Sequence, residues 1–456
     1  MATTQLEHTT VSAGNRGLWT FSFWVKRGNL AVDQKIYSEY GSASDFFAMG
    51  FTGSDTLEFQ NKDDGSNNLV YLTNRKFKDA SAWYHIVAAY DSSQASASDR
   101  FRVWINGVAE TNWGSSTLPA QDNTDLSISK GSSGTYPPRI GSYTSAYYEG
   151  WMAQVVKVDG QSLAASNFGS TDTTTGEWKP KSDGEVRTNV NAGSGFGTTG
   201  WLLNFSNASN LGYDYKTSDR SSNLDFTLSG DGFQSQTNPS NTFSTGEIAS
   251  YQASGFTWYT GNTKMLNSTG AWETVWWNMA PTKGKWYLEA KLITIGGGAF
   301  MGIADVDEIA QEYNGDFSLG VGTYQYAVKT NGQKRNNDVD SAFGNSFTSG
   351  DIMSIAMDLD NQKIYFGKNG TWEDSGDPTS GATGTGSAFD LESGLPYSPA
   401  FSSLSSAHWA INTGEGWFGG TQISSANSDG AGLGQMEYSV PSGYYTMCTK
   451  NLKTYG

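Results

Sequence analysis

The sequence predicts an all-β protein made of two antiparallel β-sandwich domains, and three observations support this fold class. Aromatic residues make up 14% of the chain, and Gly accounts for 55 of its 456 residues. Aromatic side chains pack well on pleated sheets, and Gly supplies the positive φ that tight turns need. Apolar runs of roughly four to eight residues, each ended by Gly, Asp, Asn or Ser, recur along the chain, and no long run has a helical period.

The same patterns divide the chain into domains. Because one core holds roughly 100 to 200 residues, a chain of 456 is expected to contain at least two. We predict jelly-roll sandwiches at residues 1–170 and 251–456. Residues 171–250 are rich in Gly, Ser, Thr and Asn and are predicted to be a connector. Its best strand, residues 200–206 (GWLLNFS), is expected to pair with the first domain.

Each domain is expected to contain a long central hairpin. The first reads WYHIVAAYD, a polar loop, then FRVWINGV, and the second reads DIMSIAMDLDNQKIYFGKNG. Asp358 and Asp360 raise the question of a metal loop, but Lys363 stands where a calcium loop of the EF-hand type needs Gly. Asp360-Asn361 is good turn chemistry. We therefore interpret the two aspartates as hairpin residues.

Charge and cysteine content limit the partners and the compartment. The net charge of -16 argues against nucleic acid, whose phosphates would be repelled. No apolar stretch reaches the roughly 20 residues of a membrane span, so no membrane insertion is expected. The start, MATTQLEHTT, lacks the features of a signal peptide, and Cys448 is the single cysteine. We expect folding in a reducing cytoplasm.

No motif in the sequence predicts an enzyme. There is no G-x-S-x-G elbow, no phosphate-binding Gly loop, and no carboxylate pair on a convincing strand that could serve glycoside hydrolysis. His85 lies inside a strand, where a packing or hydrogen-bonding role is expected. A polysaccharide depolymerase is kept as the enzymatic alternative.

Aromatic and acidic clusters supply the candidates for binding. Trp104 alternates with the apolar residues of its strand and is expected on an exposed face, with further aromatics in a loop nearby. The candidates for glycan or partner binding are Arg102, Trp104, Tyr147, Tyr148, Trp151 and Trp276. Three residues of the densest acidic cluster, Asp305, Asp307 and Glu308, are the candidates for a structural calcium site, and no other cofactor is expected.

The two domains resemble known families. Residues 83–108, followed by RIGSY and GWMAQVVKVDG, resemble the laminin-G-like, concanavalin-type jelly roll. The C-terminal block resembles a SPRY domain through GKWYLEAKL, MGIAD, SLGVGTYQYAV, GDIMSIAMDLDNQKIYFGKNG and INTG. Laminin-G-like rims often bind glycans or calcium, and SPRY loops usually bind proteins. The resemblance therefore implies binding to proteins or glycans.

The combination of domains resembles large structural proteins of tailed bacteriophages, the marine ones in particular. DGQSL, TGEWKPK, GWLLNFSN and the terminal P-x-G-Y-x-x-x-C-T-K-N-L pattern carry this likeness. It implies a non-enzymatic virion protein of a tail, fibre or capsid-surface appendage, made in the host cytoplasm and carried on the virion surface. Its partners would be other virion proteins, host surface glycans and copies of itself, as a trimer in a fibre. A glycan-binding adhesin or receptor-binding protein is the alternative.

Overall fold

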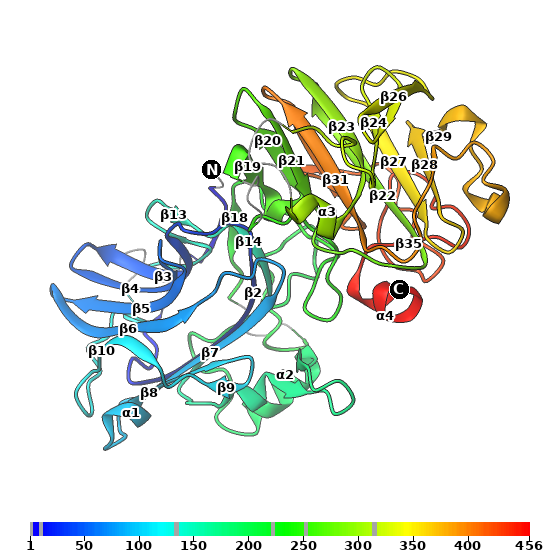
Figure 1. Ribbon diagram of the computed structural model, residues 1–456. Coiled ribbons are helices and arrows are strands. Elements are labelled where there is room, and N and C mark those ends of the chain that lie inside the picture. Colours follow the sequence, from blue (N-terminus) through cyan, green and yellow to red (C-terminus); the bar gives the residue numbers. More distant parts are fainter. Residues whose placement is uncertain (1–2, 9–11, 132–135, 220–223, 250–253, 312–316) are drawn as a thin grey trace. The chain divides into compact units, whose positions relative to one another are not determined.

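The computed structural model describes residues 3–8, 12–131, 136–219, 224–249, 254–311 and 317–456 (Figure 1). The chain folds into two compact units, unit 1 (residues 1–234) and unit 2 (residues 235–456). Both are mostly β. The helices within the described residues are short: α1 (Ala97–Arg100), α2 (Asp183–Asn191), α3 (Val306–Gln311), α4 (Thr449–Tyr455), and the 3-10 turns η1 (Ala165–Asn167), η3 (Thr260–Asn262), η4 (Glu373–Ser375) and η5 (Pro378–Thr383). None of the described helices has the length and apolar character to cross a membrane.

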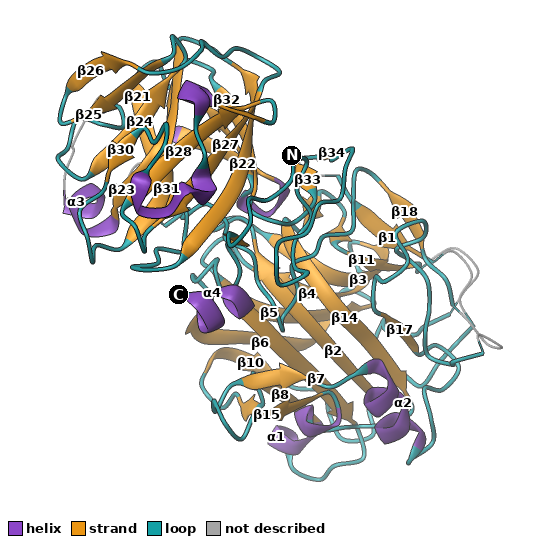
Figure 2. Ribbon diagram, turned by 90° about the vertical axis from the view of Figure 1, so that its right-hand side faces the viewer, coloured by secondary structure: helices purple, strands orange, loops and turns teal. Residues whose placement is uncertain are grey.

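Unit 1 contains two antiparallel sheets that lie face to face (Figure 2). The larger has eight strands in the order β10 (Trp113–Thr117), β6 (Ser66–Lys76), β5 (Thr56–Asp63), β4 (Asp45–Phe51), β3 (Gln34–Ser42), β11 (Pro138–Ile140), β1 (Gln5–Glu7) and β18 (Thr227–Ser229). The smaller has six, in the order β17 (Trp201–Leu203), β14 (Gly150–Asp159), β2 (Leu18–Arg27), β7 (Trp83–Asp91), β8 (Phe101–Ile105) and β9 (Val108–Ala109).

The main core of unit 1 fills the space between these sheets. Alternate residues of each strand point into it, among them Trp19, Phe21, Phe47 and Phe59, which are all fully buried. Two short hairpins complete the unit, β12 (Ser142–Tyr143) with β13 (Ala146–Tyr147), and β15 (Gly169–Thr171) with β16 (Trp178–Pro180).

A second apolar cluster covers the outer face of the smaller sheet. Val87 and Val156 of the sheet pack there with Phe168, Val186 and other residues that follow β14. Helix α2 begins with a capping box, because Ser182 accepts a hydrogen bond from the Glu185 N–H and the Glu185 carboxylate accepts one from the Ser182 N–H. Its buried Val186 and Val190 are four residues apart and so lie on one helix face.

The expected connector is therefore divided between the two units. Residues 171–234 belong to unit 1, where they supply α2, a strand to each sheet (β17 and β18) and the hairpin strand β16. Strand β17 pairs with β14 within the stretch where the sequence indicated a strand. The polar composition of this segment reflects its exposed turns, while its few apolar residues are buried.

Unit 2 also has two main sheets. The larger has nine strands, with β19 (Phe256–Tyr259), β20 (Lys264–Asn267), β32 (His408–Asn412), β22 (Lys285–Thr294), β27 (Ile352–Asp358), β28 (Lys363–Lys368) and β29 (Thr371–Trp372) in order, β30 (Phe389–Asp390) beside β28 and β35 (Tyr445–Thr446) beside β22. The second has six, in the order β21 (Trp272–Trp276), β31 (Tyr397–Leu404), β23 (Gly298–Asp305), β24 (Gln325–Lys329), β25 (Gln333–Asn336) and β26 (Val339–Ala342). Strands β33 (Trp417–Phe418) and β34 (Thr421–Gln422) form a separate hairpin.

The hairpin that the sequence indicated in unit 2 is confirmed as β27 and β28. Met353, Ile355 and Met357 point into the unit 2 core, as their alternation predicts. Asp358 accepts hydrogen bonds from the backbone and side-chain amides of Asn361. It also forms an ion pair with the Lys285 ammonium, at 2.8 Å. Its carboxylate thus holds the hairpin turn, in agreement with a structural role.

Candidate functional site

The outer face of the eight-stranded sheet in unit 1 carries a cluster of aromatic rings. Phe47 points into the core, so Phe46 and its cross-strand partner Tyr40 point outward. Tyr143 lies against both, with ring centroids 5.4 Å from Tyr40 and 5.1 Å from Phe46. We call Tyr40, Phe46 and Tyr143, together with the charged pair described next, the aromatic face.

A charged pair lies on the same face. The Lys35 ammonium is 2.9 Å from the Glu58 carboxylate, and the two residues come from β3 and β5. Burial raises the pKa of the Tyr143 hydroxyl, and Tyr40 and the Glu58 carboxylate raise it further. The Glu58 charge is therefore close enough to act on Tyr143, which links the pair to the rings.

Small residues separate the large side chains of this face. Ala48 and Gly50 lie on β4 opposite Gln60 and Glu58 of β5. Gly50 leaves no room for a side chain, since an added Cβ would lie 2.1 Å from the Gln34 carbonyl oxygen. Phe46, Ala48 and Lys35 are themselves buried, so the half-buried Tyr40 and Tyr143 are the accessible rings of this face.

The hairpin β12–β13 brings Tyr143 to the face. Ser142 is held from both sides, because its carbonyl accepts the Ser38 hydroxyl at 2.6 Å and its own hydroxyl donates to the Gln5 side chain at 2.5 Å. The ring of Tyr143 is thus fixed over β3 and β4. Within the described residues, the hydroxyls of Tyr40 and Tyr143 have no hydrogen-bond partner.

This arrangement suits a ligand with an apolar face and several hydroxyl groups. Aromatic rings offer flat surfaces for C–H groups, and phenol, amide, ammonium and carboxylate groups can donate to or accept from hydroxyls. A pyranose ring has both properties.

Trp104 and Arg102 lie elsewhere, on the opposite side of unit 1. Trp104 is half-buried against the second apolar cluster, and the Arg102 guanidinium lies over its ring at 5.4 Å and donates to the Ser162 hydroxyl. This differs from the exposed face that strand alternation predicted. The reason is that residues after β14, including α2, cover the outer face of the smaller sheet.

The three aromatic residues of the expected binding loop differ in how deeply they are buried. Tyr147 is half-buried on β13 beside the aromatic face. Tyr148 is buried, and its hydroxyl donates to the Lys26 carbonyl at 2.8 Å. Trp151 is only 9% exposed and packs edge-on against Phe233 at 5.8 Å. Only Tyr147 therefore lies near a surface that could take a ligand.

The candidates in unit 2 have structural partners. Trp276 is half-buried against a small apolar cluster on the outer face of the six-stranded sheet. The buried Asp305 accepts from the backbone amides of Asp307 and Glu308, and the Glu308 carboxylate accepts from those of Thr323 and Tyr324 at 2.8 and 2.9 Å. Across the described residues no three His, Cys, Asp or Glu side chains gather to bind a metal, and a structural calcium ion stays a prediction.

His85 is confirmed as a packing residue. It is fully buried, with its ring stacked 4.5 Å from Trp24, and its two nitrogens contact the Ser22 hydroxyl and the Trp178 indole N–H, each at 2.8 Å. Burial lowers the pKa of His85 to about 3. The ring is therefore neutral at physiological pH, and its Nδ1 accepts a hydrogen bond from the Trp178 indole N–H.

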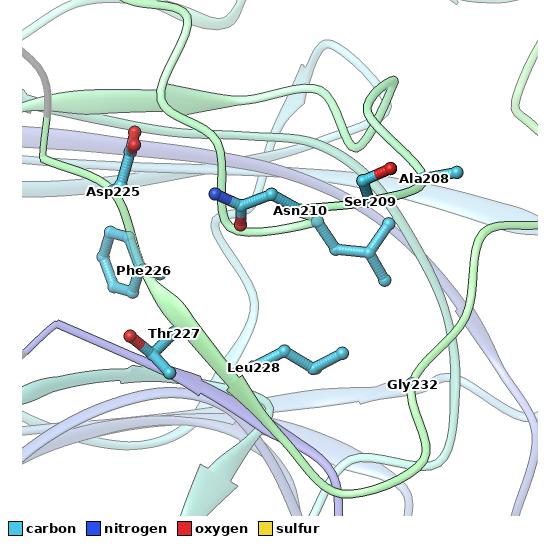
Figure 3. Close-up of a pocket in the computed structure, with 9 residues that line it drawn as sticks. Ala208, Ser209, Asn210, Asp225, Phe226, Thr227, Leu228 and Gly232 are labelled. Atoms are coloured by element: carbon cyan, nitrogen blue, oxygen red, sulfur yellow. The ribbon is translucent and has the colours of Figure 1, made fainter.

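Two hollows in unit 1 are weaker candidates for a ligand site than the aromatic face. One, of about 340 Å³, lies between residues 208–211 and the strand segment 225–228 (Figure 3). Its Asp225 carboxylate accepts the Asp214 N–H. The other, of about 280 Å³, is lined by His8, Lys157 and Trp201 among others, and the Lys157 ammonium is committed to Glu39 at 3.0 Å. Their charged groups are engaged within the protein.

Sequence reasoning missed all five residues of the aromatic face, Lys35 included. Tyr40, Phe46 and Glu58 lie on successive strands, and only the register of those strands brings them together. Tyr143 stands four residues before Tyr147, in the RIGSY motif. Strand alternation around Phe46-Phe47 was the available signal, since two adjacent aromatics cannot both face the core.

Comparison with known proteins supports the fold of this region. Residues 2–147 match a laminin-G-type family described as the concanavalin A-like lectin/glucanases superfamily. All residues of the aromatic face fall inside that range. The chain is thus mostly β, with a concanavalin-like sandwich, and this similarity fits a protein-binding or carbohydrate-binding role. No curated protein matches the chain.

Solved structures of SPRY domains are also similar to part of the chain. The SPRY domain of human HERC1 shares 17% of residues over 33% of this chain and 87% of its own, with a TM-score of 0.26. A second human SPRY domain also shares 17%, over 33% of this chain and 90% of its own, with a TM-score of 0.25. Similarities at this level carry no conclusion about what the chain binds.

Proposed function

We propose that the chain is a non-enzymatic structural protein of a tailed-bacteriophage particle and that unit 1 binds a host-surface glycan through its aromatic face. The observation that supports glycan binding is the convergence of two unpartnered phenol hydroxyls with the Lys35–Glu58 pair. Polar groups at a ligand site fix orientation, while aromatic side chains supply most of the contact area.

The virion part of this proposal rests on the resemblance of the whole chain to phage structural proteins. The same proposal places the protein on the virion surface, in contact with other virion proteins and with copies of itself. A homo-oligomer would also strengthen weak glycan binding, because linked sites rebind at high effective concentration.

A glycan array tests the binding proposal. The full chain should bind at least one class of host glycan, and Tyr143→Ala should weaken that binding about tenfold by removing the ring over β3 and β4. Trp104→Ala is the matched control, because it removes a half-buried aromatic side chain on the opposite side of unit 1. Equal loss in both variants, or no binding by the full chain, would contradict the proposal.

Two further measurements test the other parts. Mass spectrometry of purified particles should detect the chain, and its absence from particles would exclude a virion protein. Incubation with host capsule or lipopolysaccharide should release no reducing ends. Release of reducing ends would instead favour the depolymerase and exclude a purely binding role.

A further inference from the structure

Unit 2 contains a hollow of about 320 Å³ that is lined by amide side chains and by no acidic residue among the residues described. We propose that this hollow binds one monosaccharide unit of a neutral or acidic glycan, at a site separate from the aromatic face. Its lining consists of Gln236, Asn238, Asn241, Phe243, Ala426, Ser428, Gly432, Leu433, Gly434, Gln435 and Lys450. The volume is at the lower end of that of small-molecule sites.

Four of these side chains have free hydrogen-bonding groups. Within the described part of the chain, the polar ends of Gln236, Ser428, Gln435 and Lys450 have no protein partner. Each amide offers both donors and an acceptor, and Ser428 offers a hydroxyl that does both. Sugar hydroxyls are donors and acceptors at once, so the two amides and the Ser428 hydroxyl match them as neutral groups.

The backbone that carries these side chains is held in place by other residues. Asn427 and Met436 exchange two backbone hydrogen bonds, at 3.0 and 2.8 Å. The buried Asp429 accepts the amides of Ala431 and Leu433 with one oxygen, and with the other accepts from Thr446 and Asn451. A fixed wall lowers the entropy cost of binding.

The opposite wall is equally constrained. Asn238 and Asn241 exchange two backbone hydrogen bonds at 3.0 Å, and the Asn241 side-chain oxygen accepts the Lys450 N–H at 3.2 Å. Phe243 and Leu433 contribute apolar atoms for the C–H face of a sugar. The one charged side chain in the lining is Lys450, which would add affinity for a sugar carboxylate.

A sugar fits this hollow better than an extended peptide. Peptides commonly bind by adding a strand to a sheet edge or by filling a long groove. This hollow is a compact space formed by loops and by the first turn of α4. Peptide binding is therefore an outcome of the test and is not proposed.

The test uses the full chain carrying Tyr143→Ala, so that binding at the aromatic face is weakened. Saturation-transfer NMR with the methyl glycosides of glucose, galactose and glucuronic acid, at about 10 mM for weak sites, should show transfer to at least one sugar. Gln435→Ala should weaken binding about fivefold, as expected for one lost hydrogen bond. Lys450→Ala should weaken binding of the glucuronide alone.

Ala426→Trp should abolish the transfer, because the exposed Ala426 lines the hollow and an indole would fill it. Ala382→Trp, at another exposed alanine of unit 2 that lies in η5 and does not line the hollow, is the matched control and should leave the transfer unchanged. No transfer to any of the three sugars, transfer that persists in Ala426→Trp, or transfer to a Gly-Ser-Asn peptide alone would overturn the proposal. Array binding by Ala426→Trp through the aromatic face would be unaffected, so failure of one site does not imply failure of the other.

Discussion

A Tyr-x-Glu pair occurs on one strand of each unit, and the two pairs differ in what faces the carboxylate. In unit 1, Tyr37 donates to Glu39 at 2.6 Å, and in unit 2, Tyr287 donates to Glu289 at 2.9 Å. All four side chains are buried. Glu39 lies between the two sheets and receives the Lys157 ammonium at 3.0 Å as well as the Ser129 N–H.

Glu289 lies on the outer face of its sheet and receives backbone amides alone besides Tyr287. The N–H groups of Glu437 and Tyr438 each donate to it at 2.8 Å, and the described residues place no Lys or Arg in an ion pair with it. Burial raises the pKa of Glu289 to about 7, although these donors act in the opposite direction. At Glu289, three hydrogen bonds do not offset the desolvation of the buried carboxylate.

The change with the largest expected effect is the removal of the cation that faces Glu39 in unit 1. Lys157→Met leaves Glu39 buried without its partner and should lower the free energy of unfolding of unit 1 by about 3 to 5 kcal/mol. Pulsed hydrogen exchange of peptides from β3 during urea unfolding measures this effect. Adding Glu39→Gln should restore much of the loss, and peptides from β22 should not change. A loss below about 1 kcal/mol, the value of an exposed pair, would contradict the assignment.

The second prediction concerns the pH dependence of unit 2. Because the folded pKa of Glu289 is raised from 4.5 to about 7, folded unit 2 binds more protons than the unfolded chain between these values. The stability that Glu289 contributes should therefore be complete below about pH 4.5 and fall by up to roughly 3 kcal/mol as pH rises through 7. His408 of the same unit, whose pKa burial lowers to about 4, contributes the opposite slope, so the Glu289 effect is the difference between the unchanged chain and Glu289→Gln. Urea midpoints of β22 peptides at several pH values measure the change. Glu289→Gln should remove this slope, and an unchanged slope in that variant would exclude Glu289 as its source.

The third prediction is the opposite slope in unit 1. The pKa of His85 is lowered by burial from 6.5 to about 3, so the unfolded chain binds the additional proton between these values. Stability from this group is complete above pH 6.5 and is lost as pH falls, by about 2 kcal/mol at pH 5. His85→Gln should reduce the loss of stability at acid pH, measured by hydrogen exchange of peptides from β7. A loss at acid pH as steep in His85→Gln as in the unchanged chain would contradict this assignment.

The sequence predicts the strands better than it predicts their surroundings. The alternation of Met353, Ile355 and Met357 and the Asp360-Asn361 turn were sufficient for the β27–β28 hairpin, because both signals are local. The alternation within residues 101–105 likewise predicted an outward-facing Trp104. In the structure that face of the sheet is covered by residues far along the chain. Which face of a sheet meets solvent depends on long-range packing, which a strand pattern does not contain.

The candidate site was predictable only in its chemistry. Aromatic residues near Tyr147 were expected to form a ligand surface, and Tyr143 of the same hairpin lies on the aromatic face. Its partners Tyr40 and Phe46 depend on the register of β3 and β4. That register follows from which aromatic of Phe46-Phe47 enters the core, and the sequence alone allows either choice.

The smallest effect concerns a local signal that the sequence did contain. Ser182-Asp183-Gly184-Glu185 is a capping-box pattern inside the segment expected to be a connector, and the structure begins α2 there. Ser182→Ala should lower the stability of unit 1 by about 1 kcal/mol, because one helix N–H loses its acceptor, and should leave unit 2 unchanged. Hydrogen exchange of residues 183–191 measures it, with Ser206→Ala, an exposed serine of the same unit outside any helix, as the control. If Ser182→Ala left α2 as protected as before, the layer over the smaller sheet would be held by Val186 and Val190 alone. The capping box would then mark where the helix begins without stabilising it.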